Sequence, residues 1–278
     1  MAAVSYSDLT YFVEIAQVKN ISRAAERLGI RQPSLTAAVQ RLERRFECDL
    51  LIRSKTGVEL TRSGQVFVSK AKGFLAEWDR VEAEVKNHGE APAGIFTLGC
   101  HISLAMRWLP QLVPPLLARW PKLELQLVHD LSRKVNDLVA SRELDFGLVV
   151  NPLRHPDLVV RELTKDVFTF WGRGNKWSDT VLFDPDLLQA QTLIQRAEKR
   201  GIRFRRKVTS SSLELLGRLA AEGAGTAVLP THLAEAMRPK LSLAPGDPPQ
   251  FLDSVCLVYR ADAQRSVGAR ALIDALKI

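Results

Sequence analysis

Apolar residues at helical spacing dominate the first part of the chain. Between residues 9 and 16 they fall at i, i+3, i+4 and i+7, and the stretches 21–28 and 35–46 repeat this spacing, which predicts three short amphipathic helices. Helices this short are not stable alone, so the three are expected to pack together. The next segment, 50–64, reads LLIRSKTGVELTRSG and places a Lys-Thr-Gly turn between two short apolar runs. It predicts a small β-hairpin, or wing.

A longer helix is expected from Thr61, and its apolar residues change to a heptad spacing. Two series with steps of seven alternate along it: Phe67, Phe74 and Val81, and Ala71, Trp78 and Val85. Such a pattern predicts a coiled-coil seam and therefore dimerisation through this helix. The alternative is an amphipathic helix that lies on its own domain. The small N-terminal domain offers little surface for so long a stripe, which favours a partner helix.

The segment NHGEAPAG, residues 87–94, is turn-forming and marks a domain boundary. Beyond it, strand patterns alternate with helix patterns, which favours an α/β domain with mainly parallel sheets. The expected strands are Ile95–Gly99, Leu123–Val128, Asp145–Val150, Val167–Trp171, Thr192–Gln195, Thr226–Leu229 and Ser254–Tyr259. The expected helices are Ala105–Arg119, Arg133–Ser141, Ser212–Glu222, Thr231–Met237 and Val267–Leu276.

Residues 21–45 have the features that a helix-turn-helix requires. Ala24 and Ala25 allow two helices to cross closely, Gly29 permits the turn, and Pro33 sits in the first helical turn, where its missing N–H is harmless. The outer face of the second helix is then Arg31, Gln32, Ser34, Thr36, Ala37, Gln40 and Arg41. Between residues 19 and 62 there are ten Lys or Arg against five Asp or Glu. This bias favours DNA binding over a helical hairpin with a solvated face.

Composition is that of a globular protein, and its basic charge is compatible with an anionic partner, which is nucleic acid, an acidic membrane surface or an acidic metabolite. The 278 residues carry a net charge of +8, with 46% hydrophobic and 25% charged residues. The cysteines Cys48, Cys100 and Cys256 are far apart and form no CxxC pair, so neither a disulfide scaffold nor a metal site is predicted. The sequence shows no signal-peptide core and no apolar stretch long enough for a membrane span. We therefore expect a cytoplasmic protein without a cofactor.

The first sixty residues resemble the N-terminal domain of LysR-type transcriptional regulators, and the later elements follow in that family's order. The resemblance rests on Ala24-Ala25 with Leu28, Gln32-Pro33, Thr36, Leu42-Glu43, Leu51, Arg53 and Leu60-Thr61 with Gly64. It implies α plus α/β architecture: a winged helix-turn-helix at 1–61, a linker helix at 62–90 and an effector-binding domain at 91–278. The last resembles periplasmic binding proteins, with subdomain I at 91–163 plus 264–278 and subdomain II at 164–263.

The family resemblance implies DNA contacts on two helices and on the wing. The expected DNA-binding residues are Ser22, Arg23, Arg31, Gln32, Pro33, Ser34, Thr36, Gln40, Arg53 and Lys55. Arg31 departs from the family, which commonly has Ser or Thr there. The second helix therefore loses a side-chain cap worth about 1 kcal/mol and gains a potential DNA contact. Ile52 replaces the usual Phe, which we interpret as a packing variation.

The resemblance also implies a ligand cleft between two subdomains. They are expected to be joined by crossover strands, the first near Leu163–Lys165 and the return near Arg260–Ser266. Helix N-termini directed into the cleft would suit a small anion. The expected effector-binding residues are Cys100, His101, Ile102, Ser103, Leu131, Ser132, Asn151, Ser210, Ser211 and Thr226. The alternative for each serine is that it caps its own helix.

Two further features allow more than one interpretation. Cys100 suggests a redox-sensing role, but no resolving cysteine lies nearby in sequence, and this favours a buried, unreactive thiol. The run Arg196–Lys207, RAEKRGIRFRRK, holds seven basic residues and one acidic residue. A solvated face is the favoured interpretation, and an acidic partner surface or wrapped DNA is the alternative.

The sequence as a whole predicts a transcriptional regulator rather than an enzyme, since GxSxG, P-loop, HExxH and GxGxxG motifs are absent from it. The expected partners are double-stranded DNA with an inverted repeat, a small-molecule effector, a second copy in a homodimer and further copies in a homotetramer. RNA polymerase is a partner that this function allows. The alternative is an effector-independent regulator with a degenerate cleft.

Overall fold

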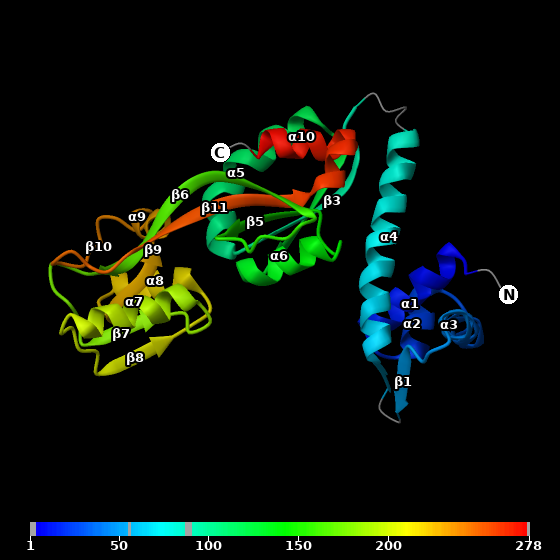
Figure 1. The fold of residues 1–278 in the computed structure, drawn as a ribbon, viewed down its shortest axis with the longest axis horizontal. Helices are drawn as coiled ribbons and strands as arrows, with labels where there is room; N and C mark the ends of the chain where they lie inside the picture. Colours follow the sequence, from blue (N-terminus) through cyan, green and yellow to red (C-terminus); the bar gives the residue numbers. More distant parts are fainter. Residues whose placement is uncertain (1–3, 55–56, 87–90, 277–278) are drawn as a thin grey trace.

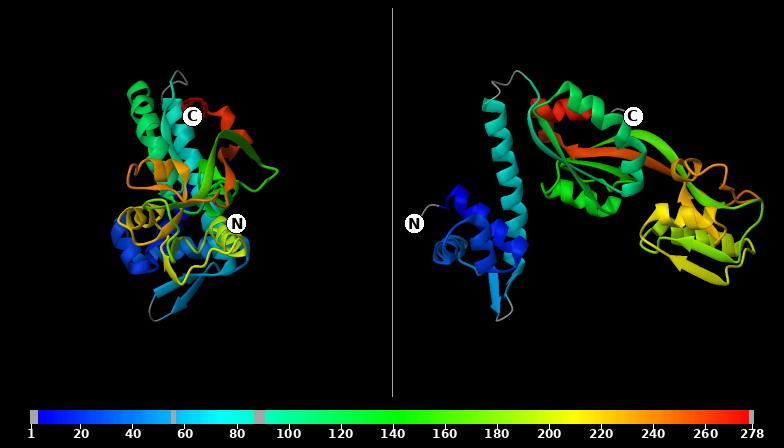
Figure 2. Two further views of the ribbon diagram at one scale, coloured as in Figure 1. Left: turned by 90° about the vertical axis from the view of Figure 1, so that its left-hand side faces the viewer. Right: turned by 180° about the vertical axis from the view of Figure 1, so that it is seen from behind.

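The computed structural model describes residues 4–54, 57–86 and 91–276. They form a small N-terminal domain, a long helix beside it, and an elongated α/β domain with two subdomains (Figure 1). The long helix lies between the N-terminal domain and the first α/β subdomain in Figure 1 and in the right-hand view of Figure 2. The predicted fold class is confirmed.

The N-terminal domain is the predicted winged helix-turn-helix. Its elements are α1 (Tyr6–Val18), α2 (Ile21–Leu28), α3 (Gln32–Phe46), β1 (Leu51–Ser54) and β2 (Gly57–Leu60), the strands pairing antiparallel. Asn20 caps α2 by accepting from the Arg23 N–H, and Gly29 ends α2 in the left-handed region at φ 65°. The sharp turn between α2 and α3 follows from this glycine, which adopts positive φ without the cost of a Cβ.

A buried ion pair ties α1 to α3. Arg41 was predicted on the outer face of α3, but its guanidinium turns inward and donates to Asp8 at 2.5 Å. Asp8 is 1% exposed and also forms a capping box with Ser5 at the start of α1. Burial raises the pKa of Asp8, but the hydrogen bonds from Arg41 and Ser5 outweigh it, and the pKa lies below its usual value.

We expect Arg41→Met to destabilise the N-terminal domain by about 2 to 3 kcal/mol, because it leaves the Asp8 carboxylate buried without its charged partner. The cost stays below that of a fully buried pair, since a third of the Arg41 side chain is exposed. Denaturant unfolding near neutral pH measures the difference. The difference in unfolding free energy between variant and wild type should shrink as pH falls through the depressed pKa of Asp8, because the wild type also loses the ion pair there. Arg44→Met, exposed on the same helix, serves as control and should change little.

The long helix α4 (Arg62–Lys86) divides into two parts. Its first part covers its own domain: the Phe67 ring lies 5.1 Å from both Phe12 and Phe46, and Ala71 is 3% exposed. Phe67 thus packs inside the N-terminal domain instead of standing free for a partner helix, and Ala71 is buried, so the predicted seam is not exposed at these two positions. The remaining members of the series are exposed: Phe74 54%, Trp78 46%, Val81 46% and Val85 68%. A partner helix stays a prediction for this second part.

The α/β domain is built on one nine-stranded sheet that runs through both subdomains. The first subdomain holds β3 (Gly94–Cys100), α5 (Ile102–Arg119), β4 (Leu123–His129), α6 (Ser132–Ala140), β5 (Phe146–Val150), η1 (Ala261–Arg265) and α10 (Val267–Ala275). The second holds β7 (Thr180–Phe183), α7 (Leu188–Lys199), β8 (Arg206–Thr209), α8 (Leu213–Ala221), β9 (Thr226–Pro230), α9 (Thr231–Glu235) and β10 (Ser242–Leu243). Two more strands, β6 (Leu158–Gly172) and β11 (Phe251–Arg260), complete the sheet. Strand order is β4-β3-β5-β11-β6-β9-β7-β8, with β10 paired to β6, and each subdomain has its own apolar core.

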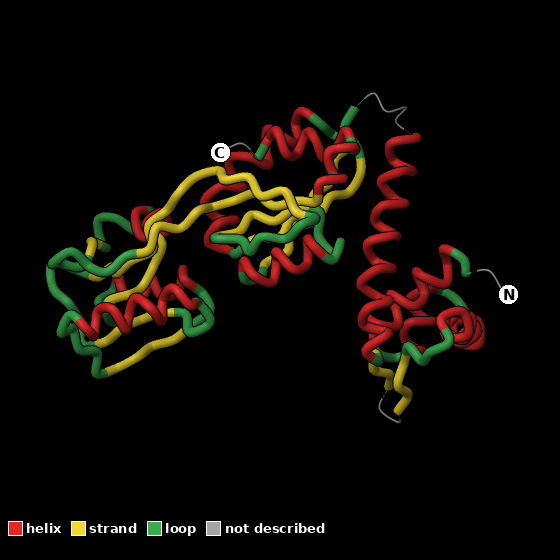
Figure 3. The backbone as a smooth tube through the Cα atoms, in the orientation of Figure 1, coloured by secondary structure: helices red, strands yellow, loops and turns green. Residues whose placement is uncertain are grey.

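Two long antiparallel strands, β6 (Leu158–Gly172) and β11 (Phe251–Arg260), connect the subdomains (Figure 3). The first crossover was expected near Leu163–Lys165 and lies within β6. The return was expected near Arg260–Ser266, but β11 returns earlier: Val255, Leu257 and Tyr259 already belong to the core of the first subdomain. A continuous strand crosses here because β11 stays paired with β6 along its whole length.

One predicted strand is wrong. Thr192–Gln195 lies inside α7, whose buried residues are Ala190, Leu193, Ile194 and Ala197. These positions follow the i, i+3, i+4, i+7 spacing of a helix. The strands β7 and β8 were not predicted. They flank α7 in sequence and pair in parallel, and β7 also pairs with β9, so they extend the sheet through the second subdomain.

Candidate functional site

The candidate DNA-binding surface lies on α2, α3 and β1. Most of the predicted side chains are exposed there: Ser22, Arg23, Arg31, Gln32, Pro33, Ser34, Gln40 and Arg53. Thr36 is half-buried on the same helix, and Lys55 lies outside the described residues. The buried face of α3, with Leu35, Ala38, Val39 and Leu42, holds this surface on the domain core.

The first turn of α3 is exposed and has no side-chain cap. Arg31 is the N-cap residue and makes no side-chain capping bond, and a proline occupies the first turn. The backbone N–H groups of this turn therefore keep their positive field for an anion such as phosphate. The Ser22 hydroxyl lies 3.3 Å from the Gln32 side-chain oxygen, which orients Gln32 against the bracing helix. On β1, the exposed Arg53 belongs to the wing.

The second candidate site is a cleft of about 350 Å³ between the α/β subdomains. It is lined by residues of both subdomains and of the two crossover strands. Its polar lining is His101, Ser103, Ser132, Arg133, Asn151, Asp166, Asp186, Gln189, His232 and Asp253. Its apolar lining includes Leu104, Leu131, Val150, Phe168, Leu188 and Leu213. A cavity of this size, mostly apolar with a few polar groups, fits a small metabolite.

The predicted effector residues divide into two groups. His101, Ser103, Leu131, Ser132 and Asn151 line the cleft. Outside its lining lie Cys100, Ile102, Ser210, Ser211 and Thr226.

Local hydrogen bonds explain why two of the excluded residues stay away from the cleft. The Ser210 hydroxyl accepts from the Ser212 N–H at the start of α8. Thr226 is 1% exposed, and its hydroxyl accepts from the Ser178 N–H. The capping interpretation thus describes the α8 serines, with Ser212 itself accepting from the Leu215 N–H.

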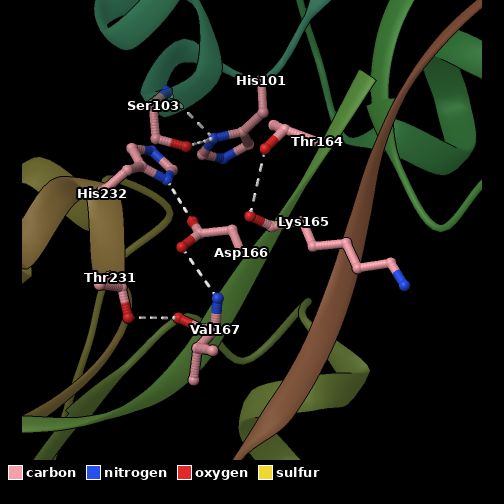
Figure 4. Close-up of polar contacts among 8 residues, drawn as sticks. All are labelled: His101, Ser103, Thr164, Lys165, Asp166, Val167, Thr231 and His232. Atoms are coloured by element: carbon pink, nitrogen blue, oxygen red, sulfur yellow. Dashed lines mark hydrogen bonds and ion pairs between the residues drawn. The ribbon is translucent and has the colours of Figure 1, made fainter. Parts of the chain in front are cut away.

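His101 and Ser103 form the polar start of α5 (Figure 4). The His101 Nδ1 accepts the Ser103 N–H at 3.2 Å and lies 2.8 Å from the Ser103 hydroxyl. Because Nδ1 accepts, the neutral ring carries its proton on Nε2. Burial lowers the pKa of His101 and outweighs the opposing charges of Glu214 and Asp184. His101 therefore offers the cleft a neutral hydrogen-bond donor.

Three acidic residues in the cleft were not predicted. Asp166 of β6 accepts from the Val167 N–H at 2.8 Å and from His232 Nδ1 at 2.5 Å (Figure 4). Asp253 of β11 accepts from the Asn151 amide at 2.7 Å. Burial raises the pKa of Asp253, the nearby Asp166 charge acts in the same direction, and hydrogen bonds from Asn151 and Gln189 oppose both. Asp186 lies at the exposed rim.

The basic run Arg196–Lys207 spans the end of α7 and the start of β8. Three of its arginines contact their own subdomain. Arg196 stacks over the Phe251 ring at 4.4 Å, Arg200 donates to the Asp247 carbonyl at 2.7 Å, and Arg206 pairs with Asp179 at 3.0 Å. Part of the run is thus structural, which fits a solvated face better than a partner-binding surface.

Cys100 lies in the core of the first subdomain, fully buried, and burial raises the pKa of its thiol to about 11. We expect iodoacetamide to leave Cys100 of the native protein unmodified near pH 8, because only about one thiol in a thousand is ionised there. Cys48, partly exposed, should react. Peptide mass spectrometry compares the two sites. Rapid labelling of native Cys100 would contradict a buried, inert thiol and would reopen redox sensing.

The fold and the two candidate sites define a class of protein: a winged helix-turn-helix whose long helix leads into a two-subdomain α/β domain with a ligand-sized cleft. The family model described as bacterial regulatory helix-turn-helix protein, lysR family, matches residues 6–65. The family model described as LysR substrate binding domain matches residues 89–277. The chain therefore belongs to the LysR family.

Individual relatives agree with this family. The HTH-type transcriptional regulator BbuR of Bordetella bronchiseptica is 33% identical over 155 residues, which are 56% of this chain and 48% of that protein. The chain spans about half the length of the first curated relatives that it matches. A full-length OxyR variant of Pseudomonas aeruginosa shares the fold with a TM-score of 0.71 at 23% identity, covering 100% of this chain and 94% of that one. CbnR in complex with its target DNA shares the fold with a TM-score of 0.69 at 21% identity, covering 98% of each chain.

No helix of the described residues has the length and apolar character needed to cross a membrane.

Proposed function

We propose that the protein is a cytoplasmic, DNA-binding transcriptional regulator that binds an inverted-repeat operator as a dimer and responds to a small molecule in the cleft. The observation that carries this proposal is the exposed first turn of α3, with Arg31, Gln32 and Ser34, together with the exposed wing residue Arg53. In a helix-turn-helix, this turn enters the major groove. Glutamine pairs there with adenine, and arginine with guanine or phosphate.

The second part of α4 supports dimerisation. Its exposed apolar residues leave a stripe that a second copy would cover. Two copies joined there would present two recognition helices, which suits an inverted repeat. The structural relative CbnR is bound to its target DNA, and the proposal extends that kind of partner to this chain. Tetramer formation through the α/β domains and contact with RNA polymerase are further parts of the proposal.

A chain of contacts supports communication between the cleft and α4. The Ser69 hydroxyl of α4 donates to Glu143 at 3.0 Å, and a Cβ on Gly73 would lie 2.9 Å from the Arg142 carbonyl oxygen. Arg142 in turn pairs with Asp262 at 2.6 Å, two residues beyond the end of β11. Because β11 lines the cleft, a ligand that favours one arrangement of the subdomains would act on α4 through these contacts.

The presence of a lined cleft favours an effector-responsive regulator over an effector-independent one. A degenerate cleft would be filled by side chains, whereas this one keeps about 350 Å³ with histidine, serine, asparagine and aspartate around it.

Selection from a random duplex library tests the proposal. We expect enrichment of an interrupted palindrome by the wild type. Gln32→Ala should relax the preference at one base pair of each half-site, at a cost of about 1 to 3 kcal/mol in discrimination. Arg53→Ala should instead weaken binding to all DNA sequences alike, and it should reduce the salt dependence of binding by about one phosphate contact.

Gln111→Ala, exposed on α5 far along the chain from the DNA-binding surface, is the matched control and should leave the selected motif intact. Uniform, strongly salt-dependent binding without any motif would contradict the proposal, because it would mean phosphate contact alone.

A further inference from the structure

Two carboxylates face the cleft from neighbouring strands. Asp166 of β6 and Asp253 of β11 are directly paired in the antiparallel register, where the chain crosses between the subdomains. Both line the cleft, and Asp253 is 6% exposed. Like charges directly opposite on antiparallel strands destabilise a sheet. Such a pair at a cavity wall is compensated when a cation binds beside it.

Among the described residues, the ion-pairing contact of this pair is that of Asp166 with His232. Asp253 is held by the neutral amides of Asn151 and Gln189. Asp166 is held by a backbone N–H and by His232, whose side chain is 9% exposed and whose Nε2 is buried without a partner among the described residues. Among the described residues that line the cleft, Arg133 is the only lysine or arginine, and its side chain is exposed. A simple anion would meet three aspartates and one arginine here.

An anion-binding element nevertheless lies next to the carboxylates. The N-cap residue of α6 is Leu131, which makes no side-chain capping bond, and its own N–H donates to the Asp130 carboxylate at 2.7 Å. The N–H groups of the first turn, from Ser132 on, lack a side-chain cap and keep the positive field of the helix end. The Ser132 hydroxyl accepts from the Val150 N–H at 2.9 Å, and the next residue, Asn151, donates to Asp253. Two consecutive residues thus connect the α6 terminus to the carboxylate pair. A zwitterionic small molecule would bring an oppositely charged group to each end of this connection.

We infer that the cleft binds a zwitterion of the α-amino-acid class, its ammonium group on Asp166 and Asp253 and its carboxylate at the first turn of α6 with Arg133. The apolar lining, with Leu131, Phe168 and Leu213, takes an apolar side chain. This inference rests on the proposed regulatory function and specifies its effector. It also revises the expectation of an anionic effector, because the anionic end alone leaves the aspartate pair unneutralised.

Thermal-shift measurements on the full chain test the inference with three matched sets of probes. The first set is the proteinogenic α-amino acids at millimolar concentration. The second is the corresponding deaminated carboxylic acids, and the third the corresponding decarboxylated amines. We expect at least one apolar amino acid to raise the melting temperature of the α/β domain, while its deaminated and decarboxylated counterparts do not.

Asp253→Asn and Asp166→Asn remove the charge with little change in shape. Calorimetric titration with the amino acid that shifts the wild type should give binding weaker by roughly 30-fold or more in each variant. Asp137→Asn, exposed on α6 outside the cleft, should keep the wild-type affinity. The melting curve of each variant without ligand shows that it folds.

A shift with the deaminated acids equal to that with the amino acids would overturn the ammonium site, and so would unchanged affinity in both aspartate variants. No shift with any of the three sets would overturn the amino-acid class. None of these results bears on the DNA selection experiment, whose failure would instead remove the regulatory function itself.

Discussion

Replacing both Phe74 and Trp78 with glutamate is expected to convert the protein to a monomer and to weaken operator binding by roughly 100- to 10,000-fold. The two side chains are 54% and 46% exposed on the second part of α4, where the Trp78 ring also lies 6.3 Å from the Tyr6 ring of α1. Burying four glutamates at a helix–helix seam would cost far more than the apolar contacts that they replace. A monomer engages one half-site and loses the high effective concentration of the second head, which sets the size of the effect.

Sedimentation velocity and DNA titration measure the two consequences separately. Leu243→Glu places a charge on a residue of the α/β domain that is 49% exposed, and it should leave both unchanged. If the double variant remained a dimer with full affinity, the second part of α4 would not be the interface. The first part of α4 needs no such test, because Phe67 packs against the core of its own domain and Ala71 is buried.

The N-terminal domain could be predicted closely because its determinants are local. Asn20 and Gly29 fix the ends of α2, and Pro33 lies in the first turn of α3. The heptad spacing of α4 was also recognised, but spacing alone does not say which partner a stripe covers. Phe67 packs on Phe12 and Phe46 only because α1 and the end of α3 lie beside it.

The second subdomain was predicted less well, and the signal that was missed is in the sequence. The segment Thr192–Gln195 reads as a strand because of its β-branched residues, yet Ala190, Leu193, Ile194 and Ala197 carry helical spacing over a longer window. The acidic pair in the cleft is different in kind. Asp166 and Asp253 are paired through the register of two strands far apart in sequence, and no local pattern specifies that register. Helix N-termini can be recognised in a sequence, whereas cross-strand partners cannot.

Gly64, one of the residues on which the family resemblance rests, has a structural role at the start of α4. It lies in the first turn of α4, where its N–H donates to the Thr61 hydroxyl at 2.9 Å. The same hydroxyl donates to the Asp49 carbonyl at 2.8 Å, and the Thr61 N–H donates to the Leu50 carbonyl at 3.1 Å. These bonds hold the end of the wing and the start of α4 against the connection after α3.

We expect Gly64→Ala to destabilise the N-terminal domain by about 3 kcal/mol and to abolish operator binding, while the α/β domain keeps its own melting transition. A Cβ at this position would lie 2.0 Å from the Leu50 carbonyl oxygen, a backbone atom that cannot turn aside. Relief requires α4 to move away from the wing, which breaks the Thr61 bonds and displaces Arg53. Calorimetry resolves the two transitions, and DNA titration reports the loss. Ser63→Ala, exposed one residue earlier, should affect neither. An unchanged first transition in Gly64→Ala would mean that the wing and α4 separate at little cost and that their contact does not position the DNA-binding surface.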